Sequence, residues 1–123
     1  MAEAVAVLHQ GENIIAAIQS DLTDEQVIAL RDDISARVGR SRARGVIVDV
    51  TALDVIDSFV ARALRSLALT AKLRGAETVV VGIRPEVAIA MVQFEMNLAP
   101  LRTAIDLDEA LEILATERRS ARV

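Results

Sequence analysis

The sequence has no cysteine, tryptophan or tyrosine, and its single histidine is His9. Without cysteine, a disulfide framework, a thiolate metal site and a cysteine nucleophile are all excluded, and a reducing compartment suits the chain. No apolar run approaches the roughly 18 residues needed to cross a bilayer, and the first residues lack the basic stretch and apolar core of a signal peptide. We therefore expect a cytoplasmic protein that is neither secreted nor embedded in a membrane.

Positive charge is also scarce, because 14 basic residues face 18 acidic ones and the net charge at pH 7 is -4. The average field of such a chain repels polyanions. Phe59 and Phe94 are the only aromatic residues, which leaves little on which to stack bases. The arginines between residues 37 and 44 lie where a helix is expected to end, and cations there complement the helix dipole. We expect no nucleic-acid partner.

What the sequence does contain suits a packed core, since 53% of its residues are hydrophobic and 26% are charged. A chain of 123 residues is served by one hydrophobic core, so we expect a single domain over residues 1–123. Residues 117–123 have a basic character without apolar periodicity, and we expect this end to fray into solvent.

Hydrophobic periodicity and turn residues predict the element order ββαβαβαβα. The expected strands cover residues 4–8, 14–18, 46–50, 78–83 and 102–105, and the expected helices follow Thr23, Asp57, Arg84 and Asp106. This order predicts one α/β domain, in which about four helices pack on a mixed sheet.

Local signals position the first three elements. Residues 9–13 are polar and contain a glycine, which predicts a hairpin loop between the first two strands. Thr23 and Gln26 have the spacing of a capping box, in which each side chain bonds the backbone amide of the other residue. Gly39 is the expected end of this first helix.

A βαβ unit occupies the middle of the chain. Residues Val46–Val50 are apolar almost throughout, which is typical of a strand covered on both faces. A helix from Ser58 to Arg74 follows, Gly75 ends it, and the strand from residue 78 should run parallel to the first through a right-handed crossover. We expect the 46–50 strand in the middle of the sheet.

The last third of the chain holds two more helices. Pro85 suits the first turn of a helix, and residues 87–96 are apolar almost all round, so this segment is either doubly buried or exposed for a partner. Residues 106–109 resemble a capping box that opens the final helix. Its expected core stripe is Leu107, Leu111 and Leu114.

Ser58 places a small hydroxyl group at a strand-to-helix junction. From the residues alone, this serine is equally a helix cap and a functional site. A hydrolytic triad would need a base, and His9 lies in a predicted loop far along the chain, so a hydrolase is a weak interpretation.

Three aspartates follow the central strand and give an alternative. Asp49, Asp54 and Asp57 could gather at the carboxyl end of this strand and bind Mg²⁺, as in a phosphoryl-accepting receiver domain. Such a receiver also needs a lysine late in its sheet, whereas the only lysine here, Lys72, lies inside a helix. Turn formation and helix capping are the structural roles open to Asp54 and Asp57.

The segment Val46–Thr51 followed by Asp54–Phe59 resembles the signature of STAS domains, the family of anti-sigma factor antagonists. Gly75-Ala76 and Val81–Pro85 extend the resemblance over almost the whole chain. The Gly-Ile-Arg-Pro part is similar to the short, single-domain stressosome antagonists of the RsbS type. The resemblance implies the STAS, or SpoIIAA-like, fold.

By this resemblance, Ser58 is a phosphoacceptor and the chain is a scaffold, not an enzyme, with no cofactor and no metal. A serine protein kinase of the RsbT-like kind would bind the unmodified protein and be released to stress signalling on phosphorylation, and a PP2C-type phosphatase would restore the serine. The resemblance also implies a homodimer and a higher-order assembly with paralogous STAS subunits that carry N-terminal sensor domains.

Two positions depart from the larger paralogues. Ala90 stands where those proteins have a second phosphorylated threonine, so Ser58 is the single family phosphosite here. The family's common glycine near the end of that helix is replaced within Phe94–Met96.

The neighbours of Ser58 are expected to form the surface that the kinase reads: Asp54, Val55, Asp57, Phe59 and Arg62. A phosphoserine carries about -1.5 to -2 charges at pH 7. At a helix N-terminus the dipole stabilises such a charge by about 0.3 to 1 kcal/mol. We therefore expect phosphorylation to change binding through local electrostatics, with little backbone movement.

Overall fold

A computed structural model describes residues 4–96 and 98–121, and within them it contains a five-stranded sheet and four helices. The element order ββαβαβαβα confirms the prediction. In chain order the elements are β1 (Val5–Gln10), β2 (Asn13–Ile18), α1 (Asp24–Ser41), β3 (Gly45–Asp49), α2 (Ser58–Leu73), β4 (Glu77–Val81), α3 (Pro85–Gln93), β5 (Arg102–Ala104) and α4 (Leu107–Ala121).

The sheet is mixed, and its strands follow the order β1-β2-β3-β4-β5. The β1–β2 pair is antiparallel and the other three pairs are parallel, so β3 lies in the middle as expected. Alternate residues of β3 point to opposite faces. Val46 and Val48 join the larger hydrophobic cluster and Ile47 joins the smaller one, and all three are fully buried.

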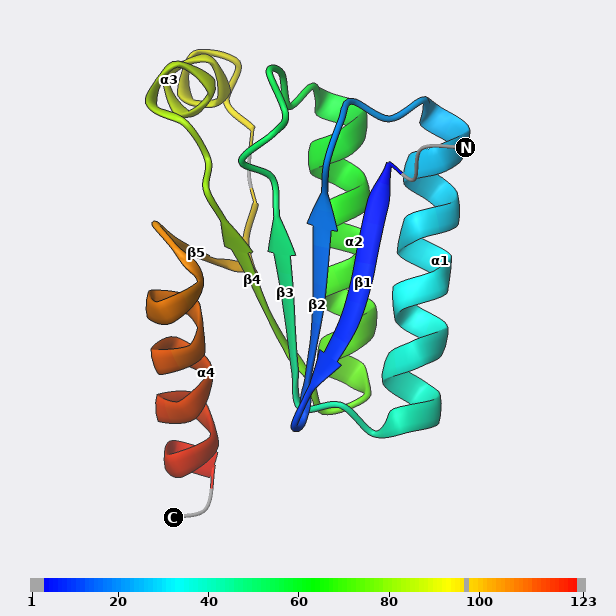
Figure 1. The fold of residues 1–123 in the computed structure, drawn as a ribbon. Helices are drawn as coiled ribbons and strands as arrows, with labels where there is room; N and C mark the ends of the chain where they lie inside the picture. Colours follow the sequence, from blue (N-terminus) through cyan, green and yellow to red (C-terminus); the bar gives the residue numbers. More distant parts are fainter. Residues whose placement is uncertain (1–3, 97, 122–123) are drawn as a thin grey trace.

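Helices cover both faces of the sheet (Figure 1). The long helices α1 and α2 lie side by side on one face, whereas α4 packs on the other face against β3, β4 and β5. Helix α3 lies beyond the carboxyl end of β4. Because β2, β3 and β4 are parallel, their carboxyl ends meet at one edge, and the segments that follow them gather there.

The predicted hairpin is confirmed, but its loop is shorter than expected. Only Gly11 and Glu12 separate β1 from β2, and Gly11 has the positive φ of 60° that such a tight turn favours. His9 is therefore in strand β1, paired with Ile14, and the prediction that it lies in a loop was wrong. The ladder continues to the end of β1 because its hydrogen bonds need only backbone groups.

Helix α1 begins as predicted and ends later than predicted. Both hydrogen bonds of the Thr23–Gln26 capping box are present, at 3.2 Å and 2.9 Å. Gly39 does not end the helix, which runs on to a left-handed C-cap at Arg42 with φ of 54°. A Cβ at Gly39 would collide with the guanidinium of Arg74, so this glycine leaves room for the side chain of the residue that caps the end of α2.

Helix α3 resolves the choice left open for residues 87–96. Val87 and Met91 are buried in the core, whereas Ile89 and Val92 are exposed, Val92 by 77%. One face of the helix is therefore core and the other is surface. The helix closes through Glu95, whose φ of 53° is the left-handed conformation that glycine usually supplies at this position.

Helix α4 differs from its prediction in two ways. Leu107 is 40% exposed, and the buried face is formed by Ala110 and Leu114 with Leu111 partly buried. The helix also continues through Ala121 instead of fraying from residue 117.

Contacts made by Arg118 explain why this end stays helical. Its Nη1 donates to Asn13 Oδ1 at 3.1 Å and lies 3.6 Å from Glu12 Oε2, which ties α4 to the β1–β2 turn. Residues 122 and 123, the last of the segment expected to fray, lie outside the described residues. Among the described residues, no helix is both long and apolar enough to cross a bilayer.

Candidate functional site

The loop that follows β3 is fixed to the carboxyl edge of the sheet. The Val50 amide donates to Val81 O at 2.9 Å, which extends the β3–β4 pairing by one residue. The Asp49 carboxylate then accepts from the Thr51 amide at 2.9 Å and the Thr51 hydroxyl at 2.6 Å. The Leu53 amide donates to Val50 O at 2.9 Å and turns the chain. Backbone and carboxylate together set the path toward α2.

Gly82, just beyond β4, allows this loop to lie close. Its φ of 84° is left-handed, and a Cβ there would overlap the Thr51 side chain. Only glycine meets both demands without strain. The segment after β4 and the loop after β3 are therefore in direct contact.

In the loop between β3 and α2, two apolar side chains are buried in the core and two other side chains are exposed. Leu53 and Ile56 are each 4% exposed and belong to the main core cluster. Between them, Asp54 is exposed and Val55 is 65% exposed. The loop thus presents an acidic and an apolar side chain to solvent from a fixed backbone.

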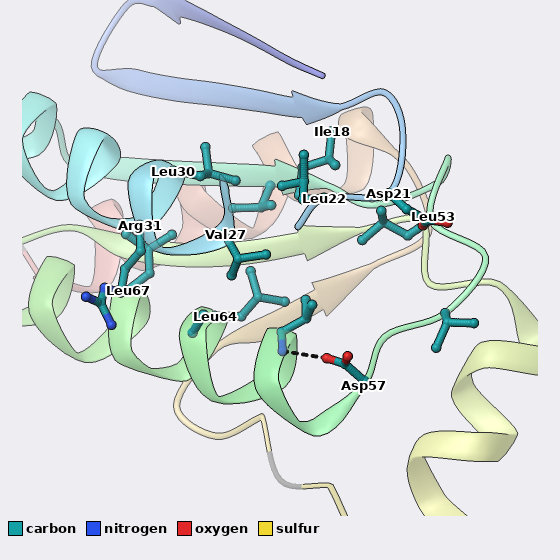
Figure 2. A pocket seen from close by; sticks show the side chains of 14 residues that line it. Ile18, Asp21, Leu22, Val27, Leu30, Arg31, Leu53, Asp57, Leu64 and Leu67 are labelled. Carbon is teal, nitrogen blue, oxygen red and sulfur yellow. Dashed lines mark hydrogen bonds between the residues drawn. The ribbon is translucent and has the colours of Figure 1, made fainter. Parts of the chain in front are cut away.

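Asp57, and not Ser58, is the N-cap of α2. Its Oδ1 accepts from the Val60 amide at 2.8 Å (Figure 2), and its carbonyl accepts from the Ala61 amide at 2.9 Å. Ser58 is the first helical residue and is exposed. Its hydroxyl makes no side-chain hydrogen bond to any residue that the structure describes. Helix capping, the structural role considered for Ser58, is therefore performed by Asp57.

The first turns of α2 complete the surface around Ser58. Phe59 and Val60 are half-buried, and Arg62, one turn after Ser58, is exposed. Arg62 forms no ion pair with the described part of the chain. It is thus free to approach an anion at position 58, since residues four apart on a helix are neighbours.

Arg84 is a member of this site that sequence reasoning did not assign. Its Nη2 donates to Leu53 O at 2.8 Å and to Asp54 Oδ1 at 2.6 Å, and its Nη1 lies 3.7 Å from Glu86 Oε1. The hydrogen bond that Arg84 donates to Asp54 raises the pKa of Arg84 above its ordinary value, which favours the charged guanidinium further. The sequence did hold an indication of this contact, because Arg84 follows β4, and the segments after parallel neighbouring strands lie at the same edge of the sheet.

The structure does not support the receiver-like alternative. Asp49 binds Thr51, Asp54 binds Arg84 and Asp57 caps α2, so each carboxylate has its own partner. Within residues 4–96 and 98–121, no group of three acidic or histidine side chains is placed to hold a metal ion. Lys72 lies near the other end of α2, 3.5 Å from Glu77.

The structure also separates His9 from Ser58. His9 pairs with Ile14, which pairs with Val46 at the start of β3, whereas Ser58 follows the carboxyl end of that strand. The two side chains therefore lie at opposite ends of the sheet. No Ser–His pair exists here for nucleophilic catalysis.

Comparison with known proteins places this geometry in a family. The STAS domain family model matches residues 4–110. A curated relative is the RsbT co-antagonist protein RsbRA of Bacillus subtilis, which is 26% identical over 102 residues. That match covers 82% of this chain but only 37% of RsbRA.

Solved structures agree with the family match. The S58E variant of RsbS from Moorella thermoacetica is 29% identical, with a TM-score of 0.81 over 95% of this chain and 99% of that one. A chain in a solved structure of the stressosome is 28% identical, with a TM-score of 0.73 over 93% of this chain and 99% of that one. Unphosphorylated SpoIIAA shares the fold at 16% identity, with a TM-score of 0.74 over 92% and 97%. The chain belongs to the STAS domain family and, within it, is similar to anti-sigma factor antagonists of the RsbS type.

Proposed function

We propose that this protein is a cytoplasmic scaffold subunit of a stressosome-like assembly, and that phosphorylation of Ser58 by a partner serine kinase regulates it. The observation that carries the proposal is that Asp57, and not Ser58, caps helix α2. The exposed Ser58 hydroxyl beside it makes no side-chain hydrogen bond within the described part of the chain. A kinase needs such a hydroxyl within reach.

The kinase-binding surface in this proposal comprises Asp54, Val55, Asp57, Phe59 and Arg62. Val55 offers an apolar contact, and Asp54 offers a carboxylate held by Arg84. Because the loop is fixed by the Leu53 and Ile56 side chains, a partner would meet this surface already formed. A pre-formed surface loses little conformational entropy on binding.

Phosphorylation would weaken this contact through charge. The new phosphate would sit beside the Asp54 and Asp57 carboxylates, and a partner docked over Val55 and Phe59 would bury part of it. Desolvating such a charge is costly unless it is paired. We therefore expect the kinase to dissociate from the phosphorylated protein and become available for stress signalling.

In this proposal the protein is acted upon and is not an enzyme. The single histidine, His9, lies at the other end of the sheet from Ser58, and the role of Ser58 is to accept a phosphoryl group that the kinase transfers from ATP. A PP2C-type phosphatase would hydrolyse the phosphoserine and restore the binding surface.

The assembly partners in the proposal are paralogous STAS subunits and further copies of this chain. The support is similarity to RsbRA, whose name describes a co-antagonist of RsbT, and to a chain of the stressosome. RsbRA is much longer than the matched region. An RsbT-like kinase is accordingly the partner proposed to act on Ser58.

Mass spectrometry after incubation with a cognate kinase and Mg-ATP tests the proposal. The expected product carries one phosphate on Ser58, and a Ser58→Ala protein should remain unmodified. Ser41→Ala is a matched control, because Ser41 is exposed and ends α1 just before the start of β3, at the opposite end of that strand from Ser58. Phosphate on an aspartate, or undiminished modification of Ser58→Ala, would contradict the proposal.

A further inference from the structure

A cavity of about 150 Å³ lies between the N-terminal halves of α1 and α2, and Asp57, the residue before Ser58, is part of its wall (Figure 2). Its walls come from β2, β3, both helices and the loops that precede them. Its charged lining residues are Asp21, Arg31 and Asp57.

The interior of this cavity is aliphatic. Val27, Leu64 and Leu67 are all buried core residues, and charge is confined to three of the lining residues. One of these, Arg31, already pairs with Asp32 at 3.1 Å. The cavity opens to solvent at its rim, where Val55 and Asp57 are exposed, and its inner walls are apolar. An enclosed engineered cavity of about 150 Å³ lined by aliphatic and aromatic side chains binds benzene, so the volume is sufficient for a guest of that size.

The sequence explains why the cavity lies at this end of the helix pair. On α2, the lining positions Val60, Ala63, Leu64 and Leu67 share one helical face. Ala63 has the shortest side chain of that face, and it lines the cavity. At the far end of the pair, by contrast, the Arg74 side chain occupies the room over Gly39.

We propose that this cavity binds a small uncharged apolar molecule, of the size of a single aromatic ring or a short branched hydrocarbon chain. Volume and aliphatic walls select this class, because a charged or strongly polar guest would lose its hydration without compensation. Protein interiors are otherwise close-packed, with few voids larger than a water molecule. The binding claim is independent of the proposed kinase.

A guest here contacts the turn that carries Ser58. Val60 and Asp57 both line the cavity, and the Val60 amide donates to Asp57 Oδ1 at 2.8 Å. Binding therefore stabilises this turn and slows hydrogen exchange of the Val60 and Ala61 amides. If the function proposed above holds, a bound guest should make Ser58 harder to phosphorylate, and this regulatory role rests on that proposed function.

Methyl NMR of the whole chain with benzene as the probe tests the binding claim. Saturable shifts are expected at methyl groups of Val27, Leu64 and Leu67, and none at Leu114, which is buried on the other face of the sheet. Slower exchange of the Val60 and Ala61 amides should accompany them. Absence of saturable shifts up to benzene saturation overturns the proposal, and shifts without slower exchange contradict the coupling to Ser58.

Filling the cavity provides the matched variant. Ala63→Leu should abolish the shifts, whereas Ala36→Leu, the same change at an exposed position of α1, should keep them. If Ala63→Leu does not fold, Ala63→Val serves with the smaller expectation of weakened binding. Unchanged benzene shifts in the folded Ala63 variant would place the guest elsewhere and overturn the assignment. Since no kinase is used, this outcome is separate from that of the phosphorylation experiment.

Discussion

At the scale of single residues, Asp57 and Ser58 are neighbours in sequence with different physical roles. Asp57 has extended backbone geometry and accepts the Val60 amide, whereas Ser58 is helical and exposed. An N-cap side chain satisfies an amide that the helix itself cannot. In the proposed function, stability and modification therefore depend on adjacent side chains.

Alanine substitutions at these two positions should separate the roles. Asp57→Ala removes the cap and should lower the free energy of unfolding by about 1 kcal/mol. Ser58→Ala removes no hydrogen bond and should change it by less than about 0.5 kcal/mol. Urea unfolding followed by circular dichroism measures both. An equal loss in the two variants would mean that Ser58 is a cap after all.

Arg84 connects the segment after β4 to the loop after β3. Arg84→Ala removes the hydrogen bonds to Leu53 O and Asp54 Oδ1, so amides of residues 50–57 should exchange faster while the fold persists. Hydrogen-exchange mass spectrometry provides the measurement. Arg62→Ala is the control, because Arg62 is exposed and has no ion pair among the described residues. Unaltered exchange in Arg84→Ala would show that the loop is held by its apolar side chains alone.

At the scale of elements, two glycines of this chain differ in what they make possible. Gly82 has a left-handed φ and lies against Thr51, whereas Gly39 is helical and lies beneath the movable tip of Arg74. The first glycine is a backbone requirement. The second only makes room for a flexible side chain.

Alanine at each glycine should therefore have opposite effects. Gly82→Ala should destabilise the protein by at least about 1 to 2 kcal/mol, the usual cost of a left-handed residue with a Cβ. Gly39→Ala should be neutral or stabilising by up to about 1 kcal/mol, since alanine favours a helix and Arg74 can move aside. Thermal unfolding compares the pair. A large loss in Gly39→Ala would mean that Arg74 cannot be displaced.

Local signals predicted the elements well where the chemistry is local. The hairpin, the Thr23–Gln26 box and the helix after Pro85 follow from turn and capping rules that act within a few residues. The end of α1 was missed because Gly39 does not end the helix but makes room for the side chain of Arg74, which is distant in sequence. The C-terminal helix was underestimated for the same reason, since Arg118 is held by the β1–β2 turn.

The candidate site was predicted only in part. Ser58 and its neighbours were identified from the sequence, and the role expected of them came from resemblance to a family and stays a proposal. Arg84 was missed as a contact because hydrogen bonding between Arg84 and Asp54 depends on how two parallel strands end side by side. The cavity could not be predicted for a similar reason, because it depends on how side chains from β2, β3, α1 and α2 pack together.

At the scale of the whole molecule, phosphorylation should leave the fold intact. The phosphate would sit at the positive end of the α2 dipole, with Arg62 one turn away, and both interactions favour it. Backbone NMR of the Ser58-phosphorylated protein should therefore show shifts concentrated in residues 54–62. Shifts spread over the sheet and α4 would indicate a rearrangement and contradict a local switch.

The affinity of the cognate kinase for the unmodified and the Ser58-phosphorylated protein tests the central claim most directly. Calorimetry should show tighter binding to the unmodified protein by about tenfold or more, a difference of about 1.4 kcal/mol, because a kinase docked over Val55 and Phe59 would desolvate the phosphate on Ser58. The Ser58→Ala protein should bind the kinase with or without prior exposure to ATP. Equal affinity for both forms of the protein, or tighter binding to the phosphorylated one, would contradict the account.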